Sequence, residues 1–341
     1  MYELLTSYES ATKAVVSFHI RCHIPVTFCS TIVFLYQFSW SLSLSSFCIN
    51  PSTHFQTTSS IFDTATTMPD LHVNGAKLYY ETFGSGPLLL LIPGADGRGT
   101  VFHDTAKYLS GHFTVACWDR RGFSQSLPIG VQDFADRLSV DADDACALIQ
   151  HLSDQPAFVF GTSSGAIVAM QLLIRHQECV RALVAHEPPA FALLPEEYRA
   201  KAAGLIEHIY SLYRAKGVQA AMEVFSGGLS AGEDGERMRY CMDTTRGDEI
   251  RANSMYWFEF ELRQYTSAAL DMEVIVAEKK KFIPAAGATS GDGPGVGPIA
   301  LLAGKVGKEV VRLPGGHISY MVEPEIFANA LWVLFEKIIK S

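Results

Sequence analysis

Ser163 stands in the kind of sequence that presents a nucleophile. It is the central residue of Gly-Thr-Ser-Ser-Gly, residues 161–165, which follows the apolar run 157–160 and precedes a helical pattern of apolar residues. A serine at a sharp turn between a strand and a helix exposes its hydroxyl for attack on a substrate. Glycine is needed two positions to either side, because a Cβ atom at Gly161 or Gly165 would press on the neighbouring strand or helix.

The serine hydroxyl is a poor nucleophile at neutral pH and requires a base to take its proton. His317 is the candidate base, since it follows a predicted strand at 309–313 and the glycine pair 315–316. His186, at the end of another predicted strand, is expected to be structural. The tightness of the turn also predicts strained backbone dihedral angles at Ser163.

The elements that must hold these residues alternate between strand and helix. An Asn-Gly pair predicts a hairpin over 71–80, and continuous apolar runs predict buried strands. The strands predicted after the hairpin are 87–92, 113–118, 157–160, 181–186, 282–286 and 309–313, and helices are predicted at 101–109, 131–152, 166–174 and 323–340. This order predicts an α/β fold with a mostly parallel sheet, helices on both faces and reactive groups at the carboxyl ends of the strands.

A largely helical block interrupts the alternation, with helical patterns at 195–215, 218–225 and 253–265. Helices inserted after the strand that ends near His186 would form a cap over the carboxyl ends of the strands. The expected domains are therefore a leader at 1–67, a core formed by 68–190 and 272–341, and a cap at 191–271 between the two parts of the core.

The leader differs in composition from the rest of the chain. No Asp, Glu, Lys or Arg occurs between Cys22 and Phe62, and 24–49 is apolar but interrupted by hydroxyl residues. A membrane span needs about 20 mostly apolar residues. Three interpretations stay open: a dispensable or disordered leader, a membrane anchor through 24–49, or a targeting sequence. Met68 resembles a natural start of the folded part.

Composition and charge narrow the class of protein. The chain has 341 residues, of which 48% are hydrophobic, enough for one large α/β domain or two small ones. The formal net charge of −9 argues against nucleic-acid binding, because no basic stripe is present to neutralise phosphates. The seven cysteines are scattered, which predicts neither a disulfide framework nor a metal site. Cys117 and Cys146 are expected to be buried free thiols in a reducing, cytoplasmic environment.

Five stretches together resemble the α/β-hydrolase superfamily with a helical cap. They are Ile92-Pro93-Gly94-Ala95, Asp119-Arg120-Arg121-Gly122-Phe123-Ser124-Gln125-Ser126, Gly161-Thr162-Ser163-Ser164-Gly165, His186-Glu187-Pro188-Pro189 and Gly315-Gly316-His317. Their order and spacing from about residue 68 to the end are more specific than any one motif. Residues 1–67 lie outside the resemblance.

The resemblance implies a role for several residues. Ser163 would be the nucleophile and His317 the base, and the backbone N–H groups of Ser164 and Ala95 would form the oxyanion hole. Pro93 replaces the histidine that often precedes the glycine in this family, which leaves the backbone donor intact. No metal or organic cofactor is implied.

The third member of the triad has two candidates. Family members usually carry the acid shortly after the strand that here ends near Gly287, where Ser290 stands instead. Asp292, two residues later in a glycine-rich loop, is the preferred acid. Glu187, at the end of the preceding strand, is the alternative, and a dyad without an acid stays open because the acid only orients the imidazole.

Other conspicuous residues are expected to be structural. In the family Asp119 and Arg121 brace the turn beside the site, and Asp271 is expected to be a similar brace. The aromatic run 256–260 is expected to form the core of the cap, and a ring that lines the substrate pocket is the alternative role.

The resemblance thus predicts a serine hydrolase that cleaves a small, fairly apolar ester, lactone or thioester through an acyl-enzyme, with secondary metabolism as a suggested setting. A carbon–carbon bond hydrolase or an acyltransferase would use the same triad. A binding protein that kept the fold and lost the chemistry is the alternative of another class. The expected partner is a small-molecule substrate, a membrane is expected only through 24–49, and the oligomeric state stays open.

Overall fold

The computed structural model describes residues 69–229 and 233–340. The predictions for the leader, residues 1–67, and for an anchor at 24–49 lie outside these described residues. Within the two described ranges, no helix combines the length and the apolar character that a bilayer crossing requires.

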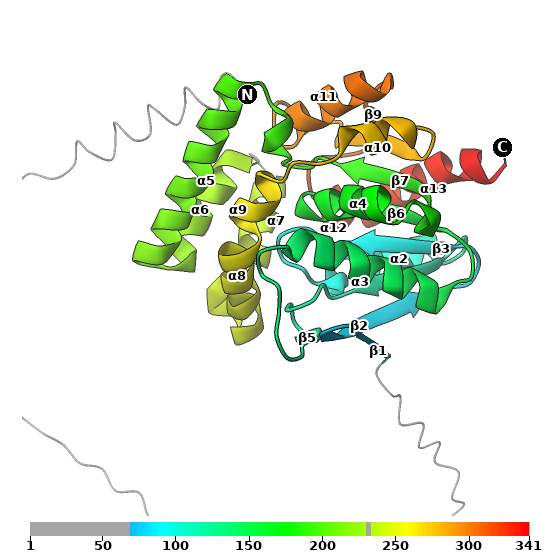
Figure 1. Cartoon of the computed structure of the whole chain (residues 1–341), viewed down its shortest axis with the longest axis horizontal. Coiled ribbons are helices and arrows are strands. Elements are labelled where there is room, and N and C mark those ends of the chain that lie inside the picture. The colour runs from blue at the N-terminus through cyan, green and yellow to red at the C-terminus, as the bar shows by residue number, and fades with distance from the viewer. Residues whose placement is uncertain (1–68, 230–232, 341) are drawn as a thin grey trace, which may run out of the picture. The chain divides into compact units, whose positions relative to one another are not determined.

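A twisted sheet forms the centre of the protein (Figure 1). Its strands are β1 (Asp70–Val73), β2 (Ala76–Phe83), β3 (Leu88–Ile92), β4 (Thr114–Trp118), β5 (Leu127–Pro128), β6 (Ala157–Thr162), β7 (Val180–His186), β8 (Phe282–Gly287) and β9 (Val311–Leu313). The order is β1-β2-β4-β3-β6-β7-β8-β9, and β5 pairs with β2. From β4 to β9 the pairs are parallel, whereas β1 and β2 form the predicted antiparallel hairpin, so the sheet is mostly parallel as predicted.

The central strands are apolar throughout because both faces of the sheet are covered. Along β3, Leu88, Leu90 and Ile92 point into one hydrophobic cluster. The alternate residues Leu89 and Leu91 point into the other cluster. A strand buried on both faces therefore shows a continuous apolar run rather than an alternating pattern.

Helices cover both faces. Those of the core are α2 (His103–Leu109), α3 (Arg137–Leu152), α4 (Ser164–Arg175), α10 (Met272–Ala277), α11 (Val296–Val306), α12 (Ser319–Val322) and α13 (Pro324–Ile339), with the 3-10 turns η1 (Gly99–Phe102) and η2 (Gln177–Cys179). The buried residues of α3, α4 and α11 belong to one cluster, and those of α2 and α13 to the other. The fold is the three-layer α/β arrangement that the strand and helix order predicts.

The cap follows β7 in the sequence and ends before β8. It contains η3 (Phe191–Leu193), α5 (Glu196–Lys216), α6 (Val218–Leu229), α7 (Glu233–Cys241), η4 (Thr244–Arg246), α8 (Asp248–Phe260) and α9 (Leu262–Thr266). These helices gather at one side of the sheet (Figure 1). Trp257 and Phe258 are buried, and Phe258 stacks on Tyr213 with ring centroids 4.6 Å apart, so these two residues of the aromatic run form cap core as predicted.

The cysteines differ in part from the prediction. Cys117 is a buried free thiol, as expected. Cys146 is not, because it forms a disulfide with Cys179, whose Cα atom lies 6.0 Å away. The pairing arises because α3 packs beside α4, which brings the turn after α4 next to Cys146. A separation of 33 residues carries no sequence signal for such a contact.

Candidate active site

Ser163 lies at the point where β6 becomes α4. Its backbone has φ 55° and ψ −128°, a combination that L-residues rarely adopt, and it is the N-cap residue of α4. The Ser163 N–H donates to the carbonyl of His186 at the end of β7, at 2.9 Å. The strained turn predicted from the sequence is therefore confirmed, and neighbouring strands hold it in place.

The flanking glycines are required by close packing. A Cβ atom on Gly161 would lie 2.5 Å from the carbonyl oxygen of Gly165 and 2.8 Å from Cβ of Ala169. A Cβ atom on Gly165 would overlap the carbonyl oxygens of Ile92 and Pro93. The clashes predicted for both positions are confirmed.

The loop after β3 lies directly against Ser163. A Cβ atom on Gly94 would be 3.0 Å from Cβ and 3.7 Å from Oγ of Ser163. Within the described ranges, the N–H groups of Ala95 and Ser164 donate no hydrogen bond to another protein group. Two free backbone donors next to a nucleophile could stabilise an oxyanion as it develops. The packing of the loop therefore supports the oxyanion role of Ala95 and Ser164, which stays a prediction.

A buried arginine that the sequence analysis did not single out holds this loop. Nη2 of Arg120 donates to the carbonyl of Gly94 at 2.9 Å. The same guanidinium pairs with Glu261, between α8 and α9, at 2.7 Å and with Asp141 on α3 at 2.6 Å. All three side chains are fully buried. Arg120 thus ties the Gly94 loop to the core and to the end of the cap.

The neighbouring motif residues are braces, as predicted. The carboxylate of Asp119 accepts from the N–H groups of Gly99 and Gln125, at 2.9 and 3.1 Å. Arg121 forms two hydrogen bonds to Asp144, at 2.7 and 2.8 Å. The resemblance predicted the bracing role of Arg121. The role of Arg120 could not be predicted in the same way, because its partners come from elements far away in the sequence.

His317 is paired with Glu187. Nδ1 of His317 lies 2.6 Å from Oε2 of Glu187, and Oε1 of Glu187 accepts from the N–H of Gly287 at 2.7 Å. Both side chains are buried. Burial raises the pKa of Glu187, but the hydrogen bond and the charge of His317 outweigh burial and lower it to about 2. A carboxylate ionised at neutral pH therefore faces the ring.

The preference for Asp292 as the acid is corrected by this geometry. One ring nitrogen can donate one proton, and Glu187 occupies Nδ1 of His317. The side chain of Asp292 lies exposed in the loop between β8 and α11. That loop packs its Gly295 against the backbone of Glu187, where a Cβ atom would overlap the Glu187 carbonyl. Glu187, the alternative acid, is thus the carboxylate that the fold brings to His317.

The conformation of Glu187 also singles it out. Its φ is +49°, one of three positive values among the non-glycine residues of the described ranges. The other two are Ser124 and Ser163. A positive φ at a residue with a long side chain needs a surrounding structure that enforces it, and such residues concentrate at functional sites. The sequence carries no direct signal for this dihedral angle.

His186 is structural, as expected. It is fully buried, and its Nδ1 lies 3.1 Å from Oγ1 of Thr162, the residue before Ser163. Burial lowers the pKa of His186 to about 4, so the ring is neutral at pH 7. Its ring stacks near His317, with centroids 6.1 Å apart. A neutral ring here adds no positive charge beside the base.

Two further features lie apart from this site. A cavity of about 200 Å³ opens in the cap between η3, α5 and α9, and its lining includes neither Ser163 nor His317. Cys146, His176 and Glu178 form a cluster with the chemistry of metal ligands at the opposite end of α4. Asp271 accepts from the N–H groups of Glu273 and Val274 and so caps α10, which confirms a structural role.

Comparisons with known proteins agree with this fold. A family model described as the alpha/beta hydrolase fold matches residues 87–231. The uncharacterized hydrolase YraK of Bacillus subtilis (strain 168) is 32% identical over 272 residues, which cover 78% of this chain and 95% of the relative. The zearalenone hydrolase of Bionectria ochroleuca is 25% identical over 262 residues, which cover 75% of this chain and 92% of the relative.

Solved structures share the fold. A thermophilic esterase from Thermogutta terrifontis has a TM-score of 0.61 at 20% identity, covering 77% of this chain and 94% of the esterase. The enol-lactonase from Burkholderia xenovorans LB400 has a TM-score of 0.60 at 18% identity, covering 79% of this chain and all of the lactonase. At these identities the likeness concerns the fold alone.

Proposed function

This chain belongs to the α/β-hydrolase family, and we propose that it is a serine hydrolase that cleaves small, fairly apolar esters, lactones or thioesters through an acyl-enzyme. The observation that carries the proposal is the buried 2.6 Å pair between Glu187 and His317. The pair is linked to the nucleophile elbow through the backbone, because the carbonyl of His186, the residue before Glu187, accepts from the N–H of Ser163, whose conformation is strained.

The pair prepares His317 to act as a base. With Nδ1–H donated to Glu187, the lone pair of the ring is on Nε2, which takes the proton of Ser163 as Oγ attacks the substrate carbonyl. The charge of Glu187 then stabilises the imidazolium. The low pKa of Glu187 keeps it ionised throughout, so it orients the ring and is not itself protonated.

The oxyanion would form next to the Gly94 loop. The N–H groups of Ala95 and Ser164 are the donors proposed for it, and the Arg120 contact to Gly94 holds the loop before the substrate binds. His317 next returns the proton to the leaving group, and water attacks the acyl-enzyme by the same route in reverse.

The substrate class rests on chemistry and on relatives. An acyl-enzyme forms readily from an acyl group with a leaving oxygen or sulfur, which esters, lactones and thioesters supply. The neighbours include an esterase and an enol-lactonase, and a relative is a hydrolase of zearalenone. A role in secondary metabolism stays a prediction.

A fluorophosphonate probe and a panel of p-nitrophenyl esters of increasing acyl length test the proposal. We expect stoichiometric labelling and ester turnover, both abolished by Ser163→Ala. Ser153→Ala, at the far end of α3, is the matched control and should leave both unchanged. Absence of labelling in the folded wild-type protein would favour the non-catalytic binding protein. Labelling at Ser163 without ester turnover would favour carbon–carbon bond cleavage or acyl transfer.

A further inference from the structure

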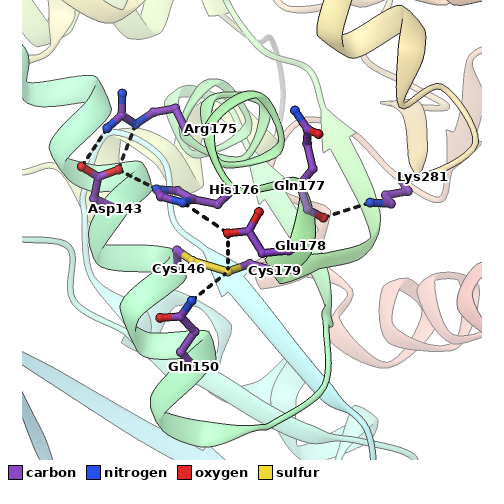
Figure 2. The surroundings of a disulfide bond; sticks show 9 residues. All are labelled: Asp143, Cys146, Gln150, Arg175, His176, Gln177, Glu178, Cys179 and Lys281. Carbon is purple, nitrogen blue, oxygen red and sulfur yellow. Dashed lines mark hydrogen bonds and ion pairs between the residues drawn. A yellow bond between two sulfur atoms is a disulfide. The ribbon is translucent and has the colours of Figure 1, made fainter.

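Four side chains of types that can bind Zn²⁺ converge at the end of α4 that is opposite to Ser163. They are Cys146 from α3 and His176, Glu178 and Cys179 from the turn that follows α4 (Figure 2). We propose that, in the thiol state, these four side chains bind one Zn²⁺ ion, and that the Cys146–Cys179 disulfide is the oxidised, metal-free form of the same site.

The ligand atoms of three of these residues already lie close together. Those of Cys146, His176 and Glu178 all lie within 4.8 Å of one another. Nδ1 of His176 is 3.6 Å from Oε1 of Glu178, and that oxygen is 4.0 Å from Sγ of Cys179. A tetrahedral zinc site with bonds of about 2.0–2.3 Å places its ligand atoms roughly 3.4–3.8 Å apart. From present separations of up to 4.8 Å, the ligand atoms of Cys146, His176 and Glu178 would have to approach one another by about 1 Å, and the two sulfur atoms would have to separate on reduction.

The histidine is oriented as a zinc ligand. Nε2 of His176 lies 2.7 Å from Oδ1 of Asp143, which Arg175 also binds at 2.9 Å (Figure 2). With its proton on Nε2 and donated to Asp143, the ring presents the Nδ1 lone pair toward Glu178. An outer carboxylate that fixes the tautomer of a ligating histidine is the usual arrangement in zinc sites.

The cysteine sulfur has an outer partner as well. Nε2 of Gln150 lies 3.7 Å from Sγ of Cys179, where an N–H group can stabilise a thiolate. Nζ of Lys281 binds the carbonyl of Gln177 at 2.9 Å and places a positive charge beside the turn. The Gln150 amide thus stabilises part of the negative charge that the thiolates bring to the ion, whereas Lys281 shares its charge with Glu278, 3.1 Å away.

The site is open to solvent on one side. Cys146 and Cys179 are buried, whereas the side chains of His176 and Glu178 are 26% and 69% exposed. An ion can therefore enter past Glu178 and reach the two sulfur atoms beneath it. The sequence did not predict the site, because Cys146 comes from a different helix and the turn supplies only one cysteine.

The two forms interconvert through a balanced two-electron step. Hydrogen peroxide, or a peroxide of the same class, oxidises the two thiolates, the S–S bond forms and the peroxide O–O bond breaks. The peroxide oxygens take two protons from solvent and leave as water, and Zn²⁺ is released because the disulfide sulfurs no longer carry charge. A dithiol reductant reverses the step.

Zinc content of the full chain tests this directly. The protein is reduced, incubated with zinc sulfate, desalted and analysed for zinc per chain. Wild type is expected to hold one equivalent more than the Cys146→Ser/Cys179→Ser double variant, and Cys241→Ser, a free cysteine in the cap, should match wild type. Asp143→Ala should weaken zinc binding about 10–100-fold through the histidine.

Two further measurements keep the proposal falsifiable. Hydrogen peroxide should release the extra zinc while the thiol count falls by two, and Co²⁺ in place of zinc should show a thiolate charge-transfer band that the double variant lacks. If the double variant does not fold, His176→Gln with Glu178→Gln replaces it, since both cysteines remain. Equal zinc content in the reduced wild type and either variant would overturn the site and leave a purely structural disulfide.

Discussion

Oε2 of Glu187 lies 2.6 Å from Nδ1 of His317, although 130 residues separate them in the sequence. Glu187 reaches the ring from the end of β7, one strand before the position that the acid usually takes in this family. The contact favours Glu187 over Asp292 as the acid that we propose for the triad.

Glu187→Gln is expected to lower kcat for a p-nitrophenyl ester by about 10³-fold or more, because an amide cannot hold the ring in the productive tautomer or stabilise its charge. Asp292→Asn is the matched control, since it is an isosteric change in the neighbouring loop, and its kcat should stay within about two-fold of wild type. A larger loss of kcat in Asp292→Asn than in Glu187→Gln would show that Asp292, after β8, is the acid.

Glu261→Ala should strongly destabilise the protein, because it leaves Arg120 with part of its charge uncompensated in a fully buried position. Breaking a buried pair costs about 3–5 kcal/mol. Urea unfolding measures the loss, and Lys107→Ala, which breaks the exposed pair with Asp104, should change stability by less than about 1 kcal/mol. Similar losses in both variants would show that the buried network contributes no more than a surface pair.

Gly165→Ala should prevent normal folding or abolish turnover, because its methyl group would overlap backbone carbonyl oxygens that cannot move without shifting β3. Gly204→Ala in α5 is the control, since nothing lies within 4 Å of the added methyl group. That variant should gain about 0.5–1 kcal/mol from helix propensity. Thermal melts and ester turnover compare the two, and an active, stable Gly165→Ala enzyme would contradict the packing described for the elbow.

His186 should make the protein acid-sensitive. Its pKa is about 4 in the folded protein, against 6.5 in a free side chain, chiefly because burial disfavours the charged ring. Above pH 6.5 the ring is neutral in both the folded and the unfolded protein, so the free energy of unfolding does not change with the charge of His186. As the pH falls from 6.5 to 4 the unfolded state takes up the proton first, and stability declines by up to about 3 kcal/mol.

Urea unfolding of wild type and His186→Asn at pH 7, 5.5 and 4 measures this effect as a difference. Glu187 and His317 face the ring and act on its pKa in opposite directions. Asp119, whose pKa burial raises to about 6, has the opposite pH dependence, but it is present in both proteins and cancels. Parallel stability profiles in the two proteins would show that His186 is protonated equally easily when folded and unfolded.

The parts of the site that the sequence predicts are those encoded by adjacent residues. The turn around Ser163 requires glycines at fixed positions, and the clash at Gly165 shows why. The mostly parallel sheet follows from strands whose apolar runs are continuous and that alternate with helices. Glu187 could not be preferred from the sequence, because its contact depends on how the loop before α11 packs on β7. Arg120 and the Cys146–Cys179 pair depend likewise on distant elements meeting.

The carbonyl of His186 holds the N–H of Ser163, and the next residue, Glu187, holds the ring of His317. The peptide unit between His186 and Glu187 therefore helps to position both Ser163 and His317, which must approach each other closely during catalysis. The number of residues between the start of β7 and Glu187 is therefore more constrained than the identity of the side chains in β7. Exchanges of apolar residues of similar volume within β7 should therefore be tolerated better than a one-residue insertion or deletion before Glu187, which would displace both groups at once.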